Sequence, residues 1–141
     1  VLEGGDFSGG TFHRAKLEDV NAAGVLMPQA DLRFADLEGS AFNNAELPYS
    51  KWFGAKLRNV DLSWANLGGA DLRGADLEGV NVEQAILEGA TISSRWENSL
   101  SNFEGSPRWT DDDGEGAAEL AADEETEAQD VREAWETLGR G

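Results

Sequence analysis

The 141-residue chain contains no cysteine, one histidine, one methionine and three prolines. The absence of cysteine excludes disulfide bonds and cysteine-ligated zinc, and it leaves the redox compartment open. No apolar run approaches the roughly 20 residues of a membrane-spanning helix. We therefore expect no transmembrane segment, although association with the periphery of a membrane complex stays open.

Basic residues are scarce as well, with 11 Lys and Arg against 28 Asp and Glu, a net charge of −17. The excess is uneven, because residues 1–95 carry 8 basic and 14 acidic residues, whereas residues 96–141 carry 3 and 14. Phosphate binding needs clustered Lys and Arg, so direct nucleic-acid binding is not expected. A basic partner, or imitation of nucleic acid by an acidic surface, agrees with this charge.

A large apolar residue occupies almost every fifth position, a period that fits neither a helix nor a flat strand. It fits a chain that turns a corner every five residues. Among nineteen such positions Ala22 is the one small residue. The positions are Leu2, Phe7, Phe12, Leu17, Ala22, Met27, Leu32, Leu37, Phe42, Leu47, Trp52, Leu57, Leu62, Leu67, Leu72, Leu77, Val82, Leu87 and Ile92.

A second series of small residues lies two positions before each large one, from Gly5 to Ala90. Both series are predicted to point inward, and the glycines found two positions after many large residues are predicted at corners that need unusual backbone dihedrals. Similar residues also recur twenty positions apart, as expected if four edges make one coil. One such column is Ala15, Ala35, Ala55 and Ala75.

The stretches 30–34, 35–39 and 70–74 read A-D-L-x-x, and this pattern resembles the pentapeptide-repeat family. The resemblance implies an all-β solenoid, a right-handed quadrilateral parallel β-helix with four pentapeptides per coil. Residues 1–95 would then form about 4.5 coils. Such rods bind other proteins and seldom carry chemistry.

Both ends of a solenoid must be closed. After Ile92 the period ends, and Trp96, Leu100 and Phe103 recur at helical spacing. We expect a short helical cap over 96–103, with an extended segment along the rod as the alternative. At the other end, Phe7 and Phe12 are candidates for the plug.

The remaining chain is an acidic extension. Residues 104–116 are predicted to be an acidic linker, because glycines, a proline and a run of three aspartates disfavour regular structure. Residues 117–138 are predicted to form an amphipathic acidic helix followed by Gly139 as its C-cap. Its apolar stripe is strongest at Val131, Trp135 and Leu138. A solubilising acidic tail without fixed structure is the alternative.

No catalytic, cofactor-binding or metal site is expected. His13 stands at an outward repeat position, and a lone surface histidine is far more often a bystander than a ligand. The acidic run at 111–115 lacks the alternate ligand spacing of a calcium loop. No nucleophile motif or phosphate loop appears.

Outward aromatic residues are the strongest candidates for partner binding. Phe34 and Phe53 are predicted on stacked turns of one face, with Tyr49 at its leading corner, and Trp64 lies on a second outward strip with Leu26 and Ile86. The alternative is that the extension covers one strip. The predicted partner-binding residues are Phe34, Tyr49, Phe53, Trp64, Trp109, Val131, Trp135 and Leu138.

The first functional hypothesis is a non-enzymatic interaction module, an assembly subunit of a larger complex that binds protein partners. Pentapeptide-repeat proteins are abundant in cyanobacteria and occur in the chloroplast lumen, so the resemblance suggests a photosynthetic assembly, and a homodimer formed through the extension. The compartment stays open between cytoplasm and, after removal of a targeting peptide, the thylakoid lumen. The second hypothesis is a DNA mimic that regulates DNA gyrase or another type II topoisomerase and protects it from quinolones, as the resemblance implies for some relatives, although the rod carries surface Lys and Arg.

Overall fold

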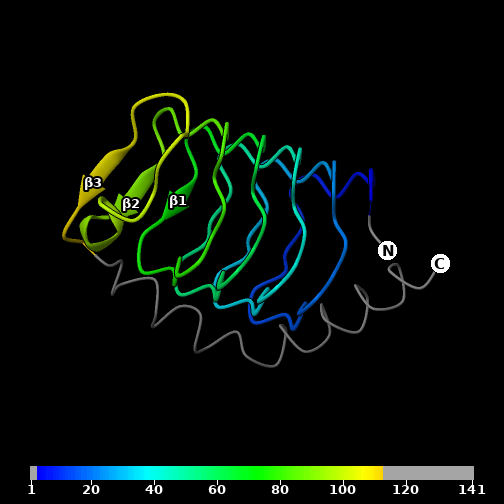
Figure 1. Cartoon of the computed structure of the whole chain (residues 1–141). Helices are drawn as coiled ribbons and strands as arrows, with labels where there is room; N and C mark the ends of the chain where they lie inside the picture. The colour runs from blue at the N-terminus through cyan, green and yellow to red at the C-terminus, as the bar shows by residue number, and fades with distance from the viewer. Residues whose placement is uncertain (1–2, 113–141) are drawn as a thin grey trace.

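The computed structural model describes residues 3–112, which form a rod of stacked four-edged coils (Figure 1). Parallel β-bridges join residues twenty positions apart, for example Asp6 to Leu26 and Asn66 to Ile86. Four ladders of such bridges run along the rod, and they begin at Asp6, Thr11, Lys16 and Asn21. The predicted coil of four pentapeptides is therefore confirmed.

Each edge is held by the same pair of backbone hydrogen bonds. The N–H of a large inward residue donates to the next coil, as from Leu32 to the carbonyl of Lys51 at 2.8 Å. The N–H of the residue before it donates to the previous coil, as from Asp31 to the carbonyl of Gly10 at 2.8 Å. These bonds satisfy the buried N–H and C=O groups of the backbone. The coils therefore form a continuous parallel stack, although most edges of residues 3–112 contain no extended strand.

The corners use left-handed backbone. Every fifth residue from Gly4 to Gly89 has a φ between 57° and 75°, which confirms the corner prediction. Half of these positions hold glycine, for which this conformation carries no steric penalty. Three hold large aromatic residues, namely Phe34, Tyr49 and Trp64.

The inward side chains fill the tube. The large series is buried from Phe12 to Ile92, and the small series is buried at most positions between Ala15 and Ala90. At the N-terminal end the rings of Phe7 and Phe12 pack edge to face, with centroids 6.2 Å apart. Phe7 is half-buried and packs against the core, as expected for an end plug.

The C-terminal end differs from its prediction. The predicted helix over 96–103 is wrong, because η1, a single 3-10 turn, spans Ser94–Trp96 and the following chain rejoins the stack. Glu104 bridges to Ile86 at a spacing of 18 instead of 20. The prediction that residues 104–116 lack regular structure is therefore wrong at Glu104, because that residue pairs with the preceding coil.

Within residues 3–112, the three β-strands lie toward this end of the rod (Figure 1). The strands β1 (Asp71–Leu72), β2 (Thr91–Ser93) and β3 (Arg108–Thr110) make one parallel sheet in the order β1-β2-β3. Bridge pairing thus continues past residue 95. The ladder that starts at Asp6 has six levels, Asp6, Leu26, Glu46, Asn66, Ile86 and Glu104, and the step from Ile86 to Glu104 adds a coil beyond the predicted range 1–95.

The shortened last coil explains the misleading spacing of its apolar residues. Leu100 is buried, and Trp96, Phe103 and Trp109 pack against the core. The rings of Phe103 and Trp109 meet edge to face at 6.4 Å, and Nε1 of Trp96 donates to the carbonyl of Ala75. These side chains close the C-terminal end of the core without a helix.

Residues 113–116 of the predicted linker and the predicted helix over 117–138 lie outside the described residues, as do Val131, Trp135 and Leu138. Within residues 3–112, no helix has the length and apolar character needed to cross a bilayer.

Candidate binding surfaces

The four ladders define four faces, each named here after its first ladder residue. A face consists of its ladder residues and of the residues two and three positions after each of them. The Asp6 face, for example, contains Leu26, Pro28 and Gln29 in one coil. Because the coil repeats every twenty residues, a face collects outward side chains that are distant in sequence.

The four faces differ in charge. On the Thr11 face five cations oppose three acids, Asp31, Asp71 and Asp111, giving 5 − 3 = +2. The Lys16 face carries three cations and six acids, the Asn21 face two acids alone, and the Asp6 face four acids alone. The five cations of the Thr11 face are Arg14, Arg33, Lys51, Arg73 and Arg108. A chain of net charge −17 thus has one cationic face.

The exposed apolar side chains gather around the Asp6 face. Within the described residues, four large apolar side chains are exposed, Leu26 at 39%, Tyr49 at 67%, Trp64 at 63% and Ile86 at 39%. Leu26 and Ile86 belong to the Asp6 ladder, and Trp64 and Tyr49 occupy the corners at which this face begins and ends. This confirms the predicted exposure of Leu26, Trp64 and Ile86, and it places Tyr49 on the Asp6 face.

A shallow groove of about 490 Å³ lies on the Asp6 face. Its lining residues are Pro48, Tyr49, Asn66, Gly68, Gly69, Glu88 and Gly89. The Tyr49 ring lies over Gly69, where an added Cβ would stand 2.5 Å from Tyr49 Cε1. Gly68, Gly69 and Gly89 therefore leave the bottom of the groove free of side chains, and the Tyr49 ring forms one of its sides. This groove was missed in the sequence, although glycines at equivalent positions of successive coils indicate it.

The structure brings Phe34 and Phe53 together on the Thr11 face, as predicted. Their rings meet edge to face with centroids 5.2 Å apart, and the Arg14 guanidinium lies 4.9 Å from the centre of the Phe34 ring. Both phenylalanines are half-buried, and Gly54 leaves room for Phe34. Trp109 lies in β3 and is also half-buried, against the end of the core.

Tyr49 and Trp64 combine high exposure with an unfavourable backbone. Their φ values are 58° and 62°, in the left-handed region that costs a bulky L-residue about 1–2 kcal/mol. Burial offsets little of this cost, because Tyr49 and Trp64 are among the most exposed of the large apolar residues described. The fold alone therefore gives no stabilising reason for an aromatic residue at either corner.

Arginine–aspartate pairs recur on the Thr11 face. Arg33 binds both carboxylate oxygens of Asp31 at 2.9 and 2.7 Å, and Arg73 binds Asp71 at 2.8 and 2.7 Å. Burial raises the pKa of Asp31, but the hydrogen bonds from the Arg33 side chain and backbone outweigh it and hold the pKa below its usual value. Asp31 therefore stays charged at neutral pH.

His13 is a correction to the sequence analysis. Its side chain is 1% exposed instead of lying on the surface, and its Nδ1 stands 3.7 Å from the Asp31 carboxylate of the next coil. The outward repeat position places His13 beside the Arg33–Asp31 pair, which helps to cover it. The position of a residue within the five-residue repeat predicts whether its side chain points inward or outward. Its burial also depends on the side chains of the neighbouring coil.

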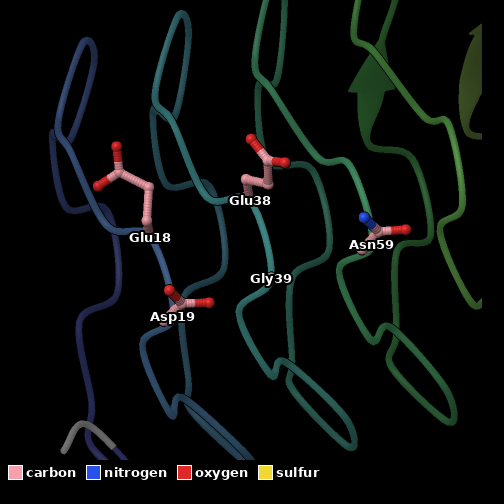
Figure 2. Close-up of a pocket in the computed structure, with 5 residues that line it drawn as sticks. All are labelled: Glu18, Asp19, Glu38, Gly39 and Asn59. Carbon is pink, nitrogen blue, oxygen red and sulfur yellow. The ribbon is translucent and has the colours of Figure 1, made fainter.

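The Lys16 face contains an acidic hollow of about 350 Å³ (Figure 2). Glu18 and Asp19 of one coil and Glu38 of the next contribute the carboxylates, beside Gly39 and Asn59. Figure 2 shows the two glutamates pointing to the same side from neighbouring coils. Within the described part of the chain, no three His, Cys, Asp or Glu side chains come together in a way that could hold a metal ion.

One family of known proteins matches the repeat of this chain. The family described as pentapeptide repeats matches residues 11–48 and 55–93, in eight copies. No curated protein matches the chain. Among solved structures, a pentapeptide repeat protein from the Arabidopsis thaliana thylakoid lumen is 29% identical, with a TM-score of 0.45, and the match covers 63% of this chain and 69% of that one.

Two further solved structures are similar. A pentapeptide repeat protein of the cyanobacterium Cyanothece is 24% identical, over 77% of this chain and 88% of that one, with a TM-score of 0.38. A plasmid-mediated fluoroquinolone resistance protein is 16% identical, over 74% of this chain and 71% of that one, with a TM-score of 0.44. The family match covers more than half of the sequence, and the observed coils have the five-residue edges of that repeat. The chain therefore belongs to the pentapeptide-repeat family and folds as its right-handed quadrilateral β-helix.

Proposed function

We propose that this protein is a non-enzymatic interaction module that binds a protein partner through the Asp6 face, as an assembly subunit of a larger complex. A photosynthetic assembly is the setting that the family resemblance suggests. The family match supports a role as a repeat protein that interacts with other proteins. The side chains on and around the Asp6 face support the choice of this face.

The observation that carries this proposal is the pair of exposed aromatic residues on left-handed backbone. Strained residues persist where another advantage offsets their cost, and that advantage is often functional. Trp64 and Tyr49 are residue types that dominate binding energy at protein interfaces. Leu26 and Ile86 extend the apolar area between their two corners. The arrangement suits a partner that crosses several coils.

The charge of the Asp6 face indicates the kind of partner. Glu46, Glu88, Glu104 and Asp6 lie on it, and the described part of this face holds no Lys or Arg. Like charges repel across an interface, whereas complementary charge accelerates association and fixes register. We therefore propose a partner segment that carries Lys or Arg beside apolar side chains.

The DNA-mimic alternative has less support. A protein that occupies a DNA-binding surface should present acidic groups along the rod, and the Thr11 face has a net charge of +2. In a gyrase supercoiling assay, we expect the full chain at micromolar concentration neither to inhibit the enzyme nor to protect it from a quinolone. Inhibition or protection would favour the mimic.

Matched corner substitutions test the proposed face. Asn44 occupies the Trp64 corner one coil earlier with a φ of 61°, so Trp64→Asn keeps the local backbone. The full chain, Trp64→Asn, Tyr49→Asn and Phe34→Asn would each be used to capture partners from an extract of the source organism, with quantitative mass spectrometry. We expect the first two variants to lose the same partners by at least tenfold, and Phe34→Asn to retain them. Loss with Phe34→Asn alone would move the interface to the Thr11 face.

A further inference from the structure

We propose that residues 113–141 of this chain occupy the Thr11 face of the same molecule as a tethered acidic occupant. This inference goes beyond the proposed function, because it concerns a different face and does not depend on any partner. Three observations support the proposal: the charge of the face, the point at which the chain leaves the rod, and the length of residues 113–141.

Charge selects the Thr11 face. Residues 113–141 contain 10 acidic and 2 basic residues, a net of 2 − 10 = −8. The Thr11 face has a net charge of +2, whereas the Asp6, Lys16 and Asn21 faces carry −4, −3 and −2 over the described residues. Several charges of one sign facing several of the other attract cooperatively, although salt screens them with a Debye length of about 10 Å at 0.1 M.

The extension begins on that same face. β3 is the last strand of the Thr11 face, and the two residues after it already bind the face. The Ser94 hydroxyl donates to the Asp111 carboxylate, and an Arg73 guanidinium nitrogen donates to Asp112 at 2.7 Å. The first acids of the extension are therefore held on the cationic face, next to Arg73 and the Lys51 level below it.

The remaining chain is long enough to follow the face to its other end. From the level of Arg73 to that of Arg14 is three coil steps, about 14 Å at the spacing of paired strands. Twenty-nine residues span about 44 Å even when fully helical. A tethered segment of this length acts at an effective concentration on the order of millimolar. Weak individual contacts are then sufficient for occupancy.

The apolar composition of the two partners also matches. The Thr11 face offers the half-buried Phe34–Phe53 pair, and the stripe predicted in the extension contains Val131, Trp135 and Leu138. The Asp6 face, whose acids repel the extension, stays accessible. Any anionic partner of the Thr11 face would have to displace residues 113–141 first.

Carbodiimide cross-linking of the full chain tests the proposal directly, because it joins lysine amines to carboxylates that lie in contact. Lys51 is the exposed lysine of the Thr11 face, and Lys56 is a matched lysine on the Lys16 face. We expect Lys51 to be linked to carboxylates of 113–141, at a yield several-fold above that of Lys56, and the yield to fall in 1 M salt. Mixing isotopically light and heavy protein separates links within a chain from links between chains.

Charge reversal supplies the second measurement. Lys51→Glu and Lys56→Glu change the net charge equally, so only their position differs. We expect Lys51→Glu to accelerate cleavage of 113–141 by a glutamate-specific protease several-fold, and Lys56→Glu to leave the rate close to that of the unaltered chain. Equal rates in all three proteins, links to Lys56 as frequent as to Lys51, or links that form only between chains would overturn the proposal.

Discussion

The Trp52 indole N–H donates to the Ser50 hydroxyl at 2.6 Å inside the tube, and that hydroxyl donates to the Leu47 carbonyl at 2.5 Å. Trp52 is the largest fully buried side chain of the described rod, and its ring packs edge to face on Phe42 at 6.4 Å. A serine in the small inward series thus satisfies the polar atom of a large inward residue. Trp52 can be buried completely for this reason.

Ser50→Ala should destabilise the rod by about 1–3 kcal/mol, because it leaves the buried indole N–H without its acceptor. Urea denaturation followed by circular dichroism measures the loss. In the double variant Ser50→Ala with Trp52→Phe, the unsatisfied donor is absent, so the two effects should be less than additive. Strict additivity would show that the hydrogen bond contributes nothing.

Leu57→Asp should unfold the rod at room temperature. Leu57 is fully buried in the middle of the stack, and an unpaired buried carboxylate costs several kcal/mol, a large part of the 5–15 kcal/mol typical of whole domains. The exposed neighbour Lys56 provides the control, since Lys56→Ala should leave the thermal melt nearly unchanged. A cooperative melt of Leu57→Asp at the original temperature would contradict the inward register.

Gly69→Ala and Gly89→Ala form a matched pair on the groove of the Asp6 face. Both glycines have left-handed backbone, with φ values of 68° and 72°. At Gly89 the new Cβ meets only ordinary contacts at 3.8 Å, whereas at Gly69 it would stand 2.5 Å from the Tyr49 ring. Both variants should lose about 1 kcal/mol through the backbone. Gly69→Ala should also displace the Tyr49 ring, which nuclear magnetic resonance shifts of that ring would report.

The stability should depend on the protonation of Asp31. Its pKa lies below the ordinary 3.8, so the unfolded chain binds the proton more readily. The resulting stabilisation is complete above the pKa of the unfolded chain and is lost as pH falls through the lower native pKa. Arg33→Gln should raise the native pKa of Asp31, as measured by titration of its carboxyl carbon resonance. Arg58→Gln should instead affect Asp76, which Arg58 contacts at 2.7 Å, and leave Asp31 unchanged.

Truncation separates the last coil from the extension. A chain that ends at Gly105 loses β3 and the packing of Trp109 on Phe103, whereas a chain that ends at Asp112 keeps both. We expect the shorter chain to be less stable by at least about 2 kcal/mol, the order of a buried aromatic side chain. Equal denaturation midpoints would mean that residues 106–112 do not contribute to the rod.

The repeat made the regular part of this fold predictable from the sequence. The identity of each inward residue, the corners and the twenty-residue coil follow from side-chain period alone, because every edge repeats the same backbone bonds. The last coil was not predictable in this way. Its spacing drops to 18 at Glu104 and 17 at Arg108, so Trp96, Leu100 and Phe103 fall at intervals that resemble a helix.

The surfaces were predictable only in part. The exposure of Leu26, Trp64 and Ile86 followed from repeat phase, but the burial of His13 depends on side chains one coil away. The positive charge of the Thr11 face was also missed, because its five cations are scattered between Arg14 and Arg108 and become neighbours only after the coils stack. Partner-binding roles for Phe34, Tyr49, Phe53, Trp64 and Trp109 remain predictions.

The five-residue edge has a consequence for rearrangement of such a rod. Removing one whole coil, for example residues 51–70, would shorten the molecule and leave every later side chain on its original face. Removing a single edge would preserve the interior equally well, yet it would turn everything beyond the cut by a quarter revolution. Cations and acids that had shared a face would then lie on different faces. A deletion of five residues could therefore change the charge of each face while the buried side chains of the core stay the same.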